Sequence, residues 1–382
     1  MQLYGEIMDL RIVNVKTKRQ IRDFVEFQLE HYKGNPYYVP PIITDEMAVF
    51  MPDKNPAFET AELQLFLAYR GDKIVGRIGA IVSRAANEKY HYKNLRFSWI
   101  EFIEDYEVCK LLLDTAIEWG RQRGMTTVSG PHGFNDFDMQ GMLVEGYDKM
   151  ATIASFYNYS YYPEYLERYG FEKEIDFIEY LSTPTGETNK PEQLFKVSDY
   201  VRKKNNIHFV EYPRTKDYIK RAPEIFSLLE TAFDKNFGTV PLTENQTKYY
   251  TKKYLLYLSP KLIKLAENEK GELVGFVITM PNMSEAFRKA NGHMFPTGIF
   301  HILKAMRSTE CLDFYFLGVH PDYRKKGVDA VIVSELLKTV MEMGFKKTES
   351  NQLLENNTMV QAMWKFYSPV NHKRRRIFNK TI

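Results

Sequence analysis

The residues best able to do chemistry in this 382-residue chain lie in one loop of its second half, between Leu317 and Ala330. An apolar run ends at Val319, a polar loop follows, and a helical pattern begins near Gly327. Backbone N–H groups converge where a helix begins, and the helix dipole favours negative charge there. The loop therefore predicts an anion site, in which Gly327 lets the backbone approach the ligand closely.

Three consecutive cations strengthen this prediction. Arg324, Lys325 and Lys326 would surround a bound anion and donate charge-assisted hydrogen bonds to it. Val328 would open the helix behind them. The alternative is a basic turn between a strand and a helix that binds no ligand.

The elements that must position this loop occur twice in the sequence. Each half carries a hairpin pattern, a strand, an amphipathic helix, a short strand, a second helix and a last strand. A duplicated order of this kind predicts two domains of one architecture. The predicted hairpins, strands and helices pair as Leu65–Val82 with Leu262–Thr279, Phe97–Ile103 with Leu312–Val319, Val108–Arg123 with Val328–Met343, and Thr126–Ser129 with Lys347–Ser350.

A linker divides the two halves. The stretch Ser182–Pro191 is rich in Pro, Gly, Thr and Asn, which disfavour regular structure. We predict two domains, residues 1–185 and 186–382, each an α/β (α+β) layer built on a mixed, mostly antiparallel sheet flanked by helices. The Met- and Phe-rich stretch Met280–Glu310 interrupts the second repeat and reads as a helical insertion or lid, or as an ordinary packed excursion.

Composition narrows the class of protein. A net charge of +3 is too small to indicate a nucleic-acid partner, and two distant cysteines fit neither a disulfide framework nor a metal site. No signal-peptide pattern or membrane-length apolar run is present, so we expect a cytoplasmic protein with no membrane partner. The basic run His372–Arg376 indicates a solvated or alternating strand edge, or a phosphate contact.

The loop resembles a known motif. Val319, Pro321, Arg324 and Gly327 match the acyl-CoA motif Val-x-Pro-x-x-Arg-x-x-Gly-x-Gly/Ala of the GNAT superfamily of N-acyltransferases, while Asp329 stands where that family has Gly or Ala. With the repeated strand order, the chain looks like a tandem GNAT protein, which implies acetyl-CoA or another acyl-CoA as co-substrate and no metal.

The resemblance also implies roles for neighbouring residues. In such folds the strand before the loop separates from its neighbour, and the pantetheine arm lies in the gap. Leu317, Gly318 and Val319 would then offer backbone groups to that arm. Asn357 matches the Asn that opens the family's next helix and would also contact the cofactor. Trp364 stands nearest the family's Tyr, so Tyr367, one turn later, is the better candidate to protonate the CoA thiolate.

Acyl transfer to an amine requires the neutral amine, and therefore benefits from a general base. The resemblance places an acidic base on the strand before the motif, where this chain has Asp313. Strand alternation predicts that Asp313, Tyr315, Leu317 and Val319 share one face. His320 is a second candidate, because imidazole titrates near neutral pH.

The first half lacks the cationic motif. Glu104, Asp105 and Glu107 stand where the cations should be, so we expect no usual CoA site there. A loop rich in His, Asn and Asp and a Tyr-rich segment follow, and they predict either a substrate pocket or a polar turn beside an aromatic core. The candidate substrate residues are His132, Asn135, Asp136 and Tyr162.

We therefore expect an enzyme that transfers an acyl group from CoA to the amine of a small molecule or peptide. One alternative is a transferase that resembles the Fem enzymes and uses aminoacyl-tRNA. The other is a non-catalytic protein that binds acyl-CoA or another small molecule.

Overall fold

The computed structural model describes residues 10–183, 191–254, 258–364 and 369–382. The chain forms two compact units. Unit 1 comprises Met1–Asp176, Ser284–His301 and Arg374–Ile382, and unit 2 comprises Phe177–Met283 and Ile302–Lys373. The predicted boundary between residues 185 and 186 falls outside the described residues.

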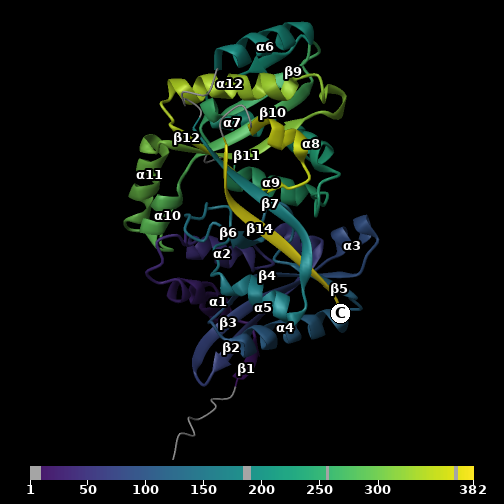
Figure 1. Cartoon of the computed structure of the whole chain (residues 1–382), viewed down its shortest axis with the longest axis vertical. Coiled ribbons are helices and arrows are strands. Elements are labelled where there is room, and N and C mark those ends of the chain that lie inside the picture. The colour runs from purple at the N-terminus through teal and green to yellow at the C-terminus, as the bar shows by residue number, and fades with distance from the viewer. Residues whose placement is uncertain (1–9, 184–190, 255–257, 365–368) are drawn as a thin grey trace, which may run out of the picture. The chain divides into compact units, whose positions relative to one another are not determined.

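Unit 1 is a sheet with helices on both faces (Figure 1). Its strands run in the order β1-β2-β3-β4-β5, antiparallel except for the parallel pair β4 and β5. Alternate side chains of β2 and β3 pack against α4 on one face and against α1 and α2 on the other. The elements are β1 Leu10–Asn14, α1 Lys18–His31, α2 Ile43–Val49, η1 Pro56–Glu59, β2 Ala61–Arg70, β3 Lys73–Ser83, α3 Arg84–Tyr90, β4 Asn94–Phe102, α4 Tyr106–Arg121, β5 Thr127–Gly130, β6 Met142–Glu145 and α5 Tyr161–Tyr169.

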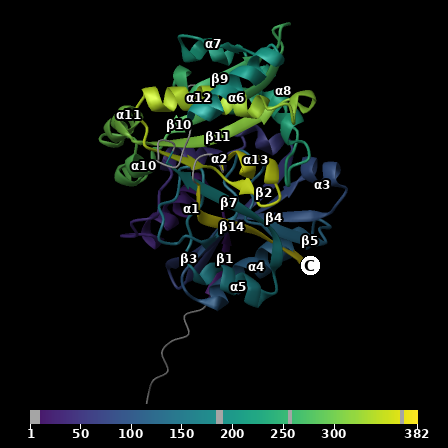
Figure 2. The ribbon, with the colours of Figure 1, turned by 45° about the horizontal axis from the view of Figure 1, so that its top comes forward.

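Unit 2 repeats this plan. Its strands run in the order β12-β11-β10-β9-β8, and β11 and β12 form the parallel pair. Helix α12 packs on β9–β11, and α6 packs on α12 (Figure 2). The elements are α6 Pro191–Lys204, β8 His208–Val210, α7 Thr215–Ile219, α8 Ala222–Phe233, α9 Glu244–Tyr254, η3 Pro260–Leu262, β9 Ile263–Glu267, β10 Leu273–Pro281, β11 Cys311–Val319, η4 Pro321–Tyr323, α12 Val328–Glu342, β12 Lys347–Ser350, β13 Leu353–Leu354 and α13 Thr358–Trp364.

The predicted repeat of hairpin, strand, helix, strand, helix and strand is confirmed in both halves. Helix α12 illustrates why the pattern could be read. Val328, Ile332, Leu336 and Val340 recur every four residues or so and are all buried against the sheet. The insertion is helical, as one interpretation held, with α10 at Ser284–Ala290 and α11 at Gly298–Ser308.

The last strand of each half contributes to both units. Strand β7, Glu172–Ser182, pairs with β12 and β13 in unit 2 over Phe177–Ser182. Strand β14, Val370–Thr381, pairs with β5 and β6 in unit 1 over Arg374–Thr381. Each unit is therefore completed by a strand from the other half of the sequence.

The basic run at the start of β14 lies in a strand whose residues alternate between buried and half-buried, which agrees with one of the predicted alternatives and not with the phosphate contact. The run is neither solvated nor free to hold phosphate, because its cations from 373 to 376 are neutralised or hydrogen-bonded. Lys373 and Arg375 are buried. The pairings are Lys373 with Glu179 and Glu349, Arg374 with Glu145, Arg375 with Ser155, and Arg376 with Asp176. Within the described residues, no helix is both long enough and apolar enough to cross a membrane.

Candidate functional site

The loop between β11 and α12 has the backbone expected of an anion site. Gly327 precedes the helix in the left-handed conformation, at φ 77°, and no side chain caps the helix start. The N–H of Val331 is the first to bond within the helix, to the carbonyl of Gly327 at 3.1 Å. The N–H groups of Val328, Asp329 and Ala330 therefore point out of the helix end, where they could bind a phosphate oxygen.

The three predicted cations occupy different surroundings. Arg324 donates from Nη2 to the carbonyl of Ala232 at 2.6 Å, which ties the loop to the end of α8. Lys325 and Lys326 are exposed, and the Lys326 ammonium lies 5.0 Å from the centre of the Tyr323 ring. Among the described residues no ion pair joins Asp329 to Lys326. The two lysines are thus available to an anion, and Arg324 also fixes the loop.

The edge of β11 beside this loop has an unpaired stretch. The ladder between β11 and β12 covers only Cys311–Phe314 and Lys347–Ser350, and it is extended by one bond from the N–H of Asn351 to the carbonyl of Phe314. On the other edge, β10 stays paired with β11 as far as Val319. Backbone groups of residues 317 to 319 that face away from β10 consequently have no partner strand in the described structure.

Glycine at position 318 is required by packing. A Cβ there would lie 2.6 Å from the ring of Phe276 on β10. Gly318 therefore brings β10 and β11 together, whatever its backbone offers to a ligand.

The predicted shared face of β11 is wrong. The register slips between Ile278 and Thr279 of β10, which pair with Phe316 and Phe314, so a bulge leaves one residue of β11 unmatched. Leu312 packs against the α12 side before the bulge, and Leu317 and Val319 pack against it after. Asp313 therefore lies on the opposite face from Leu317 and Val319.

On that opposite face Asp313 belongs to a buried group of charges. It pairs in register with Glu349 of β12. Lys373 of β14 lies between two carboxylates, with Nζ 2.6 Å from Glu349 Oε1 and 2.9 Å from Glu179 Oε2. His372 Nε2 lies 3.2 Å from Glu349 Oε1. We call Asp313, Glu179, Glu349, His372 and Lys373 the acidic centre.

The pKa values of Asp313 and Glu349, which face each other across the ladder, are shifted in opposite directions. Burial and the neighbouring Glu349 carboxylate raise the pKa of Asp313 well above its usual value. Burial also opposes ionisation of Glu349, but Lys373 and His372 outweigh it and hold the pKa of Glu349 below its usual value. Asp313 therefore favours the protonated form and Glu349 the ionised form.

Asp313 is itself incompletely satisfied. Its Oδ1 accepts a hydrogen bond from Asn282 Nδ2 at 2.8 Å, whereas its buried Oδ2 has no hydrogen-bond partner among the described residues. A buried polar atom without a hydrogen-bond partner destabilises the folded state unless another group, such as a ligand, forms a hydrogen bond with it. The acidic centre can therefore exchange a proton with a group that reaches Oδ2.

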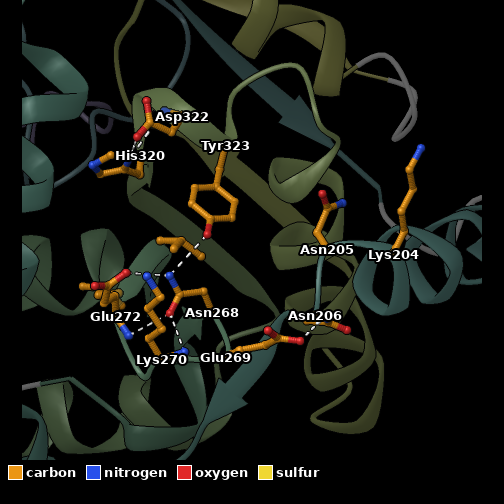
Figure 3. Close-up of a pocket in the computed structure, with 12 residues that line it drawn as sticks. Lys204, Asn205, Asn206, Asn268, Glu269, Lys270, Glu272, His320, Asp322 and Tyr323 are labelled. Carbon is orange, nitrogen blue, oxygen red and sulfur yellow. Dashed lines mark hydrogen bonds and ion pairs between the residues drawn. The ribbon is translucent and has the colours of Figure 1, made fainter.

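His320, the other candidate base, lies apart from these groups beside a polar pocket of about 550 Å³ (Figure 3). Its Nδ1 accepts from the N–H of Asp322 at 3.3 Å, and Tyr323 accepts from Asn268 at 3.2 Å. The pocket opens over the turn between β9 and β10, on the side of β11 opposite the unpaired edge. A ligand that follows this edge would not fill it.

Two further predicted residues, Asn357 and Trp364, have structural roles at the helix after β12. Asn357 Oδ1 accepts from the N–H of Val360 at 3.3 Å at the start of α13. Trp364 is buried, with ring centres 5.1 Å from Phe314 and 6.2 Å from Tyr180, so it is a core aromatic. Tyr367 lies outside the described residues.

In unit 1 the acidic counterpart of the loop is tied into the fold. Asp105 caps α4 by accepting from the N–H of Glu107 at 2.9 Å, and it forms an ion pair with Arg70. This leaves a carboxylate, rather than free N–H groups, at the start of the helix, in line with the expectation that this loop does not bind phosphate.

The predicted substrate residues of unit 1 fall into two places. His132 and Asn135 are buried in the loop after β5, where the N–H of His132 donates to the carbonyl of Phe97 at 2.9 Å. Burial, and then Arg96, hold the pKa of His132 well below its usual value. Asp136 is half-buried in the same loop. Tyr162, on α5, joins a different cluster.

That cluster surrounds a buried carboxylate, Glu101, which sequence reasoning missed. Glu101 Oε2 accepts from Tyr162 at 3.1 Å and from Tyr32, and Arg77 Nη2 lies 3.7 Å from Oε1. His31 Nε2 lies 2.8 Å from the Tyr162 hydroxyl. Burial raises the pKa of Glu101 to about 7 although Arg77 opposes it, and burial and Arg77 lower that of His31 to about 4.

Sequence reasoning also missed Glu179, Glu349 and Lys373. The available signal was a charged residue inside each of three strand patterns, which is unusual unless the charges meet one another. The sequence could not show that they do, since they come from three separate strands.

No family model matches the chain. Protein YghO of Escherichia coli (strain K12) is 27% identical over 373 residues, which cover 96% of this chain and 94% of that protein. Bacterial ceramide synthase of Caulobacter vibrioides (strain NA1000 / CB15N) is 24% identical over 384 residues, with 98% of each chain covered.

Among solved structures, a tandem GNAT protein from the clavulanic acid biosynthesis pathway, solved without AcCoA, covers 98% of this chain and 98% of its own. The TM-score is 0.56 at 12% sequence identity, so this likeness is one of fold. It agrees with the duplicated strand order and with the parallel pair next to the loop in unit 2. This protein therefore has the tandem GNAT fold, the fold of the GCN5-related acyltransferases.

Proposed function

We propose that this protein is an acyl-CoA-dependent N-acyltransferase whose working site lies in unit 2. The observation that carries the proposal is the edge of β11 from residue 317 to 319, which has no partner strand in the described structure and leads to the uncapped start of α12. A pantetheine arm along this edge would bring a pyrophosphate to the helix start and a thioester toward Asp313.

The chemistry requires one proton acceptor. The amine nitrogen attacks the thioester carbonyl carbon and the C–S bond breaks, so that an amide and the CoA thiolate result. The Asp313–Glu349 pair takes up the proton that the amine loses, because Glu349 is ionised and Asp313 has a free oxygen. The thiolate needs a proton in turn, and Tyr367 remains the predicted donor.

The proposed class of acceptor rests on the relative whose name states an activity, bacterial ceramide synthase. Ceramide is a long-chain amino alcohol whose nitrogen carries a fatty acyl group, so an enzyme called a ceramide synthase acylates a lipid amine. We propose the same class of acceptor here, a long-chain amine, because the similarity to that relative extends over 98% of both chains.

The first experiment measures binding and turnover with the full-length chain. Saturating acyl-CoA stabilises the folded state, by about 2.7 kcal/mol at a concentration of 100 Kd, and so raises the melting temperature. Release of free CoA in the presence of sphinganine, with octylamine and a short peptide amine for comparison, then reports turnover and acceptor preference.

A matched pair of variants tests the acidic centre. Glu349→Gln should retain the stabilisation by acyl-CoA and lower kcat by at least about a hundredfold, since a general base contributes roughly 10²–10⁴ in rate. Glu335→Gln, at a half-buried position of α12 where the carboxylate forms an ion pair with Lys338, should leave both the stabilisation by acyl-CoA and kcat unchanged.

Two outcomes would contradict the proposal. If no acyl-CoA at millimolar concentration changes the melting temperature while an aminoacyl-tRNA does, the Fem-like alternative holds. If acyl-CoA binds but no amine is acylated, the protein is a binding protein.

A further inference from the structure

The bulge in β11 places a tyrosine on the same face of the strand as the acidic centre. Phe314 and Leu317 both pack in the core formed with α12. Because side chains alternate along a strand, the odd step between these two leaves two consecutive residues on the opposite face. They are Tyr315 and Phe316, and that face is the one on which Asp313 lies. The bulge therefore brings Tyr315 next to Asp313.

The hydroxyl of this tyrosine is left unsatisfied by the protein. Tyr315 Oη is buried and has no hydrogen-bond partner among the described residues, as is also true of Asp313 Oδ2. Burial and the neighbouring Asp313 carboxyl raise the pKa of Tyr315 well above its usual value, so the hydroxyl keeps its proton at neutral pH. The strand thus presents two adjacent buried polar groups whose hydrogen bonds a ligand could complete.

The spacing of the two side chains restricts that ligand. Residues two apart on one face of a strand have their Cα atoms roughly 6–7 Å apart. A molecule that forms hydrogen bonds with both Asp313 and Tyr315 must therefore carry its two polar groups only a few bonds apart. Its amine is the group that meets Asp313, because the Asp313–Glu349 pair takes up the amine proton in the proposed reaction.

The surrounding charges decide what the second polar group can be. The Glu349 carboxylate is near enough to contribute to the raised pKa of Tyr315, and Glu349 favours its ionised form. A carboxylate on the ligand would be repelled there. A hydroxyl buries no further charge, and it can both donate to and accept from the hydroxyl of Tyr315.

We propose that Tyr315 selects an amino alcohol as the acyl acceptor, by a hydrogen bond to a hydroxyl on the carbon next to the amine-bearing carbon. This inference rests on the proposed function, since it specifies the acceptor of that same site, and it makes Tyr315 a specificity-determining residue. The half-buried ring of Phe316, 6.5 Å from the ring centre of Tyr315 and 6.5 Å from that of Phe233 on α8, offers an apolar surface to the carbon chain of the acceptor.

The test compares two acceptors that differ by one hydroxyl, 2-aminooctan-1-ol and octan-2-amine, with the full chain and either acetyl-CoA or palmitoyl-CoA. The parent should show a kcat/KM about 10–100-fold higher for the amino alcohol, because the simple amine leaves the tyrosine hydroxyl unsatisfied. Tyr315→Phe should remove this preference by lowering kcat/KM for the amino alcohol alone. Any effect of amine basicity cancels when parent and variant are compared on the same acceptor.

Three further measurements separate selectivity from folding and catalysis. Tyr200→Phe makes the same chemical change at a side chain that is 65% exposed, and it should keep the preference of the parent. Asp313→Asn should slow both acceptors alike, since the amine is common to them. Tyr315→Phe should not lower the melting temperature, because the hydroxyl that it removes has no partner in the described structure.

Binding of the acceptors is measured separately from turnover. In the presence of CoA, which has no acyl group to transfer, the amino alcohol should raise the melting temperature of the parent more than the amine does. This difference should disappear in Tyr315→Phe. If it does so while no acyl-CoA supports turnover, the proposed function is wrong and the amino-alcohol site stands.

Three results would overturn the inference: a preference that Tyr315→Phe leaves unchanged, an equal loss of kcat/KM with both acceptors in that variant, or, where nothing turns over, melting temperatures that both acceptors raise equally or not at all. The second result would place Tyr315 in the acyl transfer itself. Equal acylation of the two acceptors by the parent would refute the inference alone and leave the proposed function standing.

Discussion

At the scale of single residues, the buried ammonium group of Lys373 is the main reason that one carboxyl of the acidic centre, Glu349, favours its ionised form. Lys373 is fully buried between Glu179 and Glu349, and three carboxyls face this one lysine together with His372. The group carries more potential negative than positive charge, and the pKa of Asp313 rises accordingly. A substrate that arrives as an ammonium ion would complement this imbalance.

Replacement of this lysine should therefore be severe. Lys373→Met should lower the free energy of unfolding by roughly 3–5 kcal/mol at neutral pH, because it leaves buried carboxylates without a counter-charge. Adding Glu349→Gln should recover part of the loss, and Lys347→Met, on the exposed end of β12, should cost little. Urea unfolding measures all of them; a cost below about 1 kcal/mol would show that the carboxyls are already neutral.

At the scale of elements, α12 links the loop to the sheet. The sequence predicted this helix to within one residue of its observed end, because its apolar residues repeat at the helical period. The bulge in β11 could not be predicted in the same way. Alternation along Asp313–Val319 looks regular in sequence, and the extra residue becomes visible only when β11 is paired with β10.

The two glycines that flank α12 allow a controlled test of its start. Gly327 and Gly344 both have φ of 77°. Alanine at either position should cost about 1–2 kcal/mol from backbone strain alone. Only Gly327→Ala should also weaken stabilisation by acyl-CoA, since only position 327 adjoins the uncapped N–H groups. Thermal shifts with and without ligand decide this, and equal shifts in both variants would place the anion elsewhere.

At the scale of the whole molecule, duplication could be read from sequence, but the pairing of the final strands could not. Strand β14 lies in the second half of the chain and yet completes unit 1 through β5. The alternation of apolar and polar residues along a strand predicts which of its faces is buried. It does not predict which strand of a sheet will pair with it.

The free energy of unfolding should depend on pH through the buried carboxyl of Glu101 in unit 1. Its pKa is about 7 in the folded protein and near 4.5 when unfolded, so the folded state holds the proton more strongly. The contribution of this group to the free energy of unfolding is fully present below pH 4.5. It is lost as the pH rises through 7, which lowers the free energy of unfolding by roughly 3 kcal/mol. Between pH 5 and 8.5, Glu101→Gln should therefore gain about that much stability relative to the parent.

Unfolding curves across this pH range test the point, with exposed Glu118→Gln on α4 as the control. His31 acts in the opposite direction, because its pKa is lowered to about 4 and its contribution grows as the pH rises toward 6.5. The difference between parent and variant removes that effect. A constant difference at all pH values would mean that Glu101 does not titrate in this range.

The sequence by itself determined the repeated order of strands and helices, the helix behind the loop, and the four-residue match from Val319 to Gly327, because periodicity and short motifs are local properties of a chain. Tertiary structure alone decided the rest. It set Asp313 on the face away from Leu317, joined it to Glu349 and Lys373 from separate strands, and turned a basic run into internal ion pairs. Charges from distant segments meet only after the sheet has formed, and only then does burial set which of them is ionised.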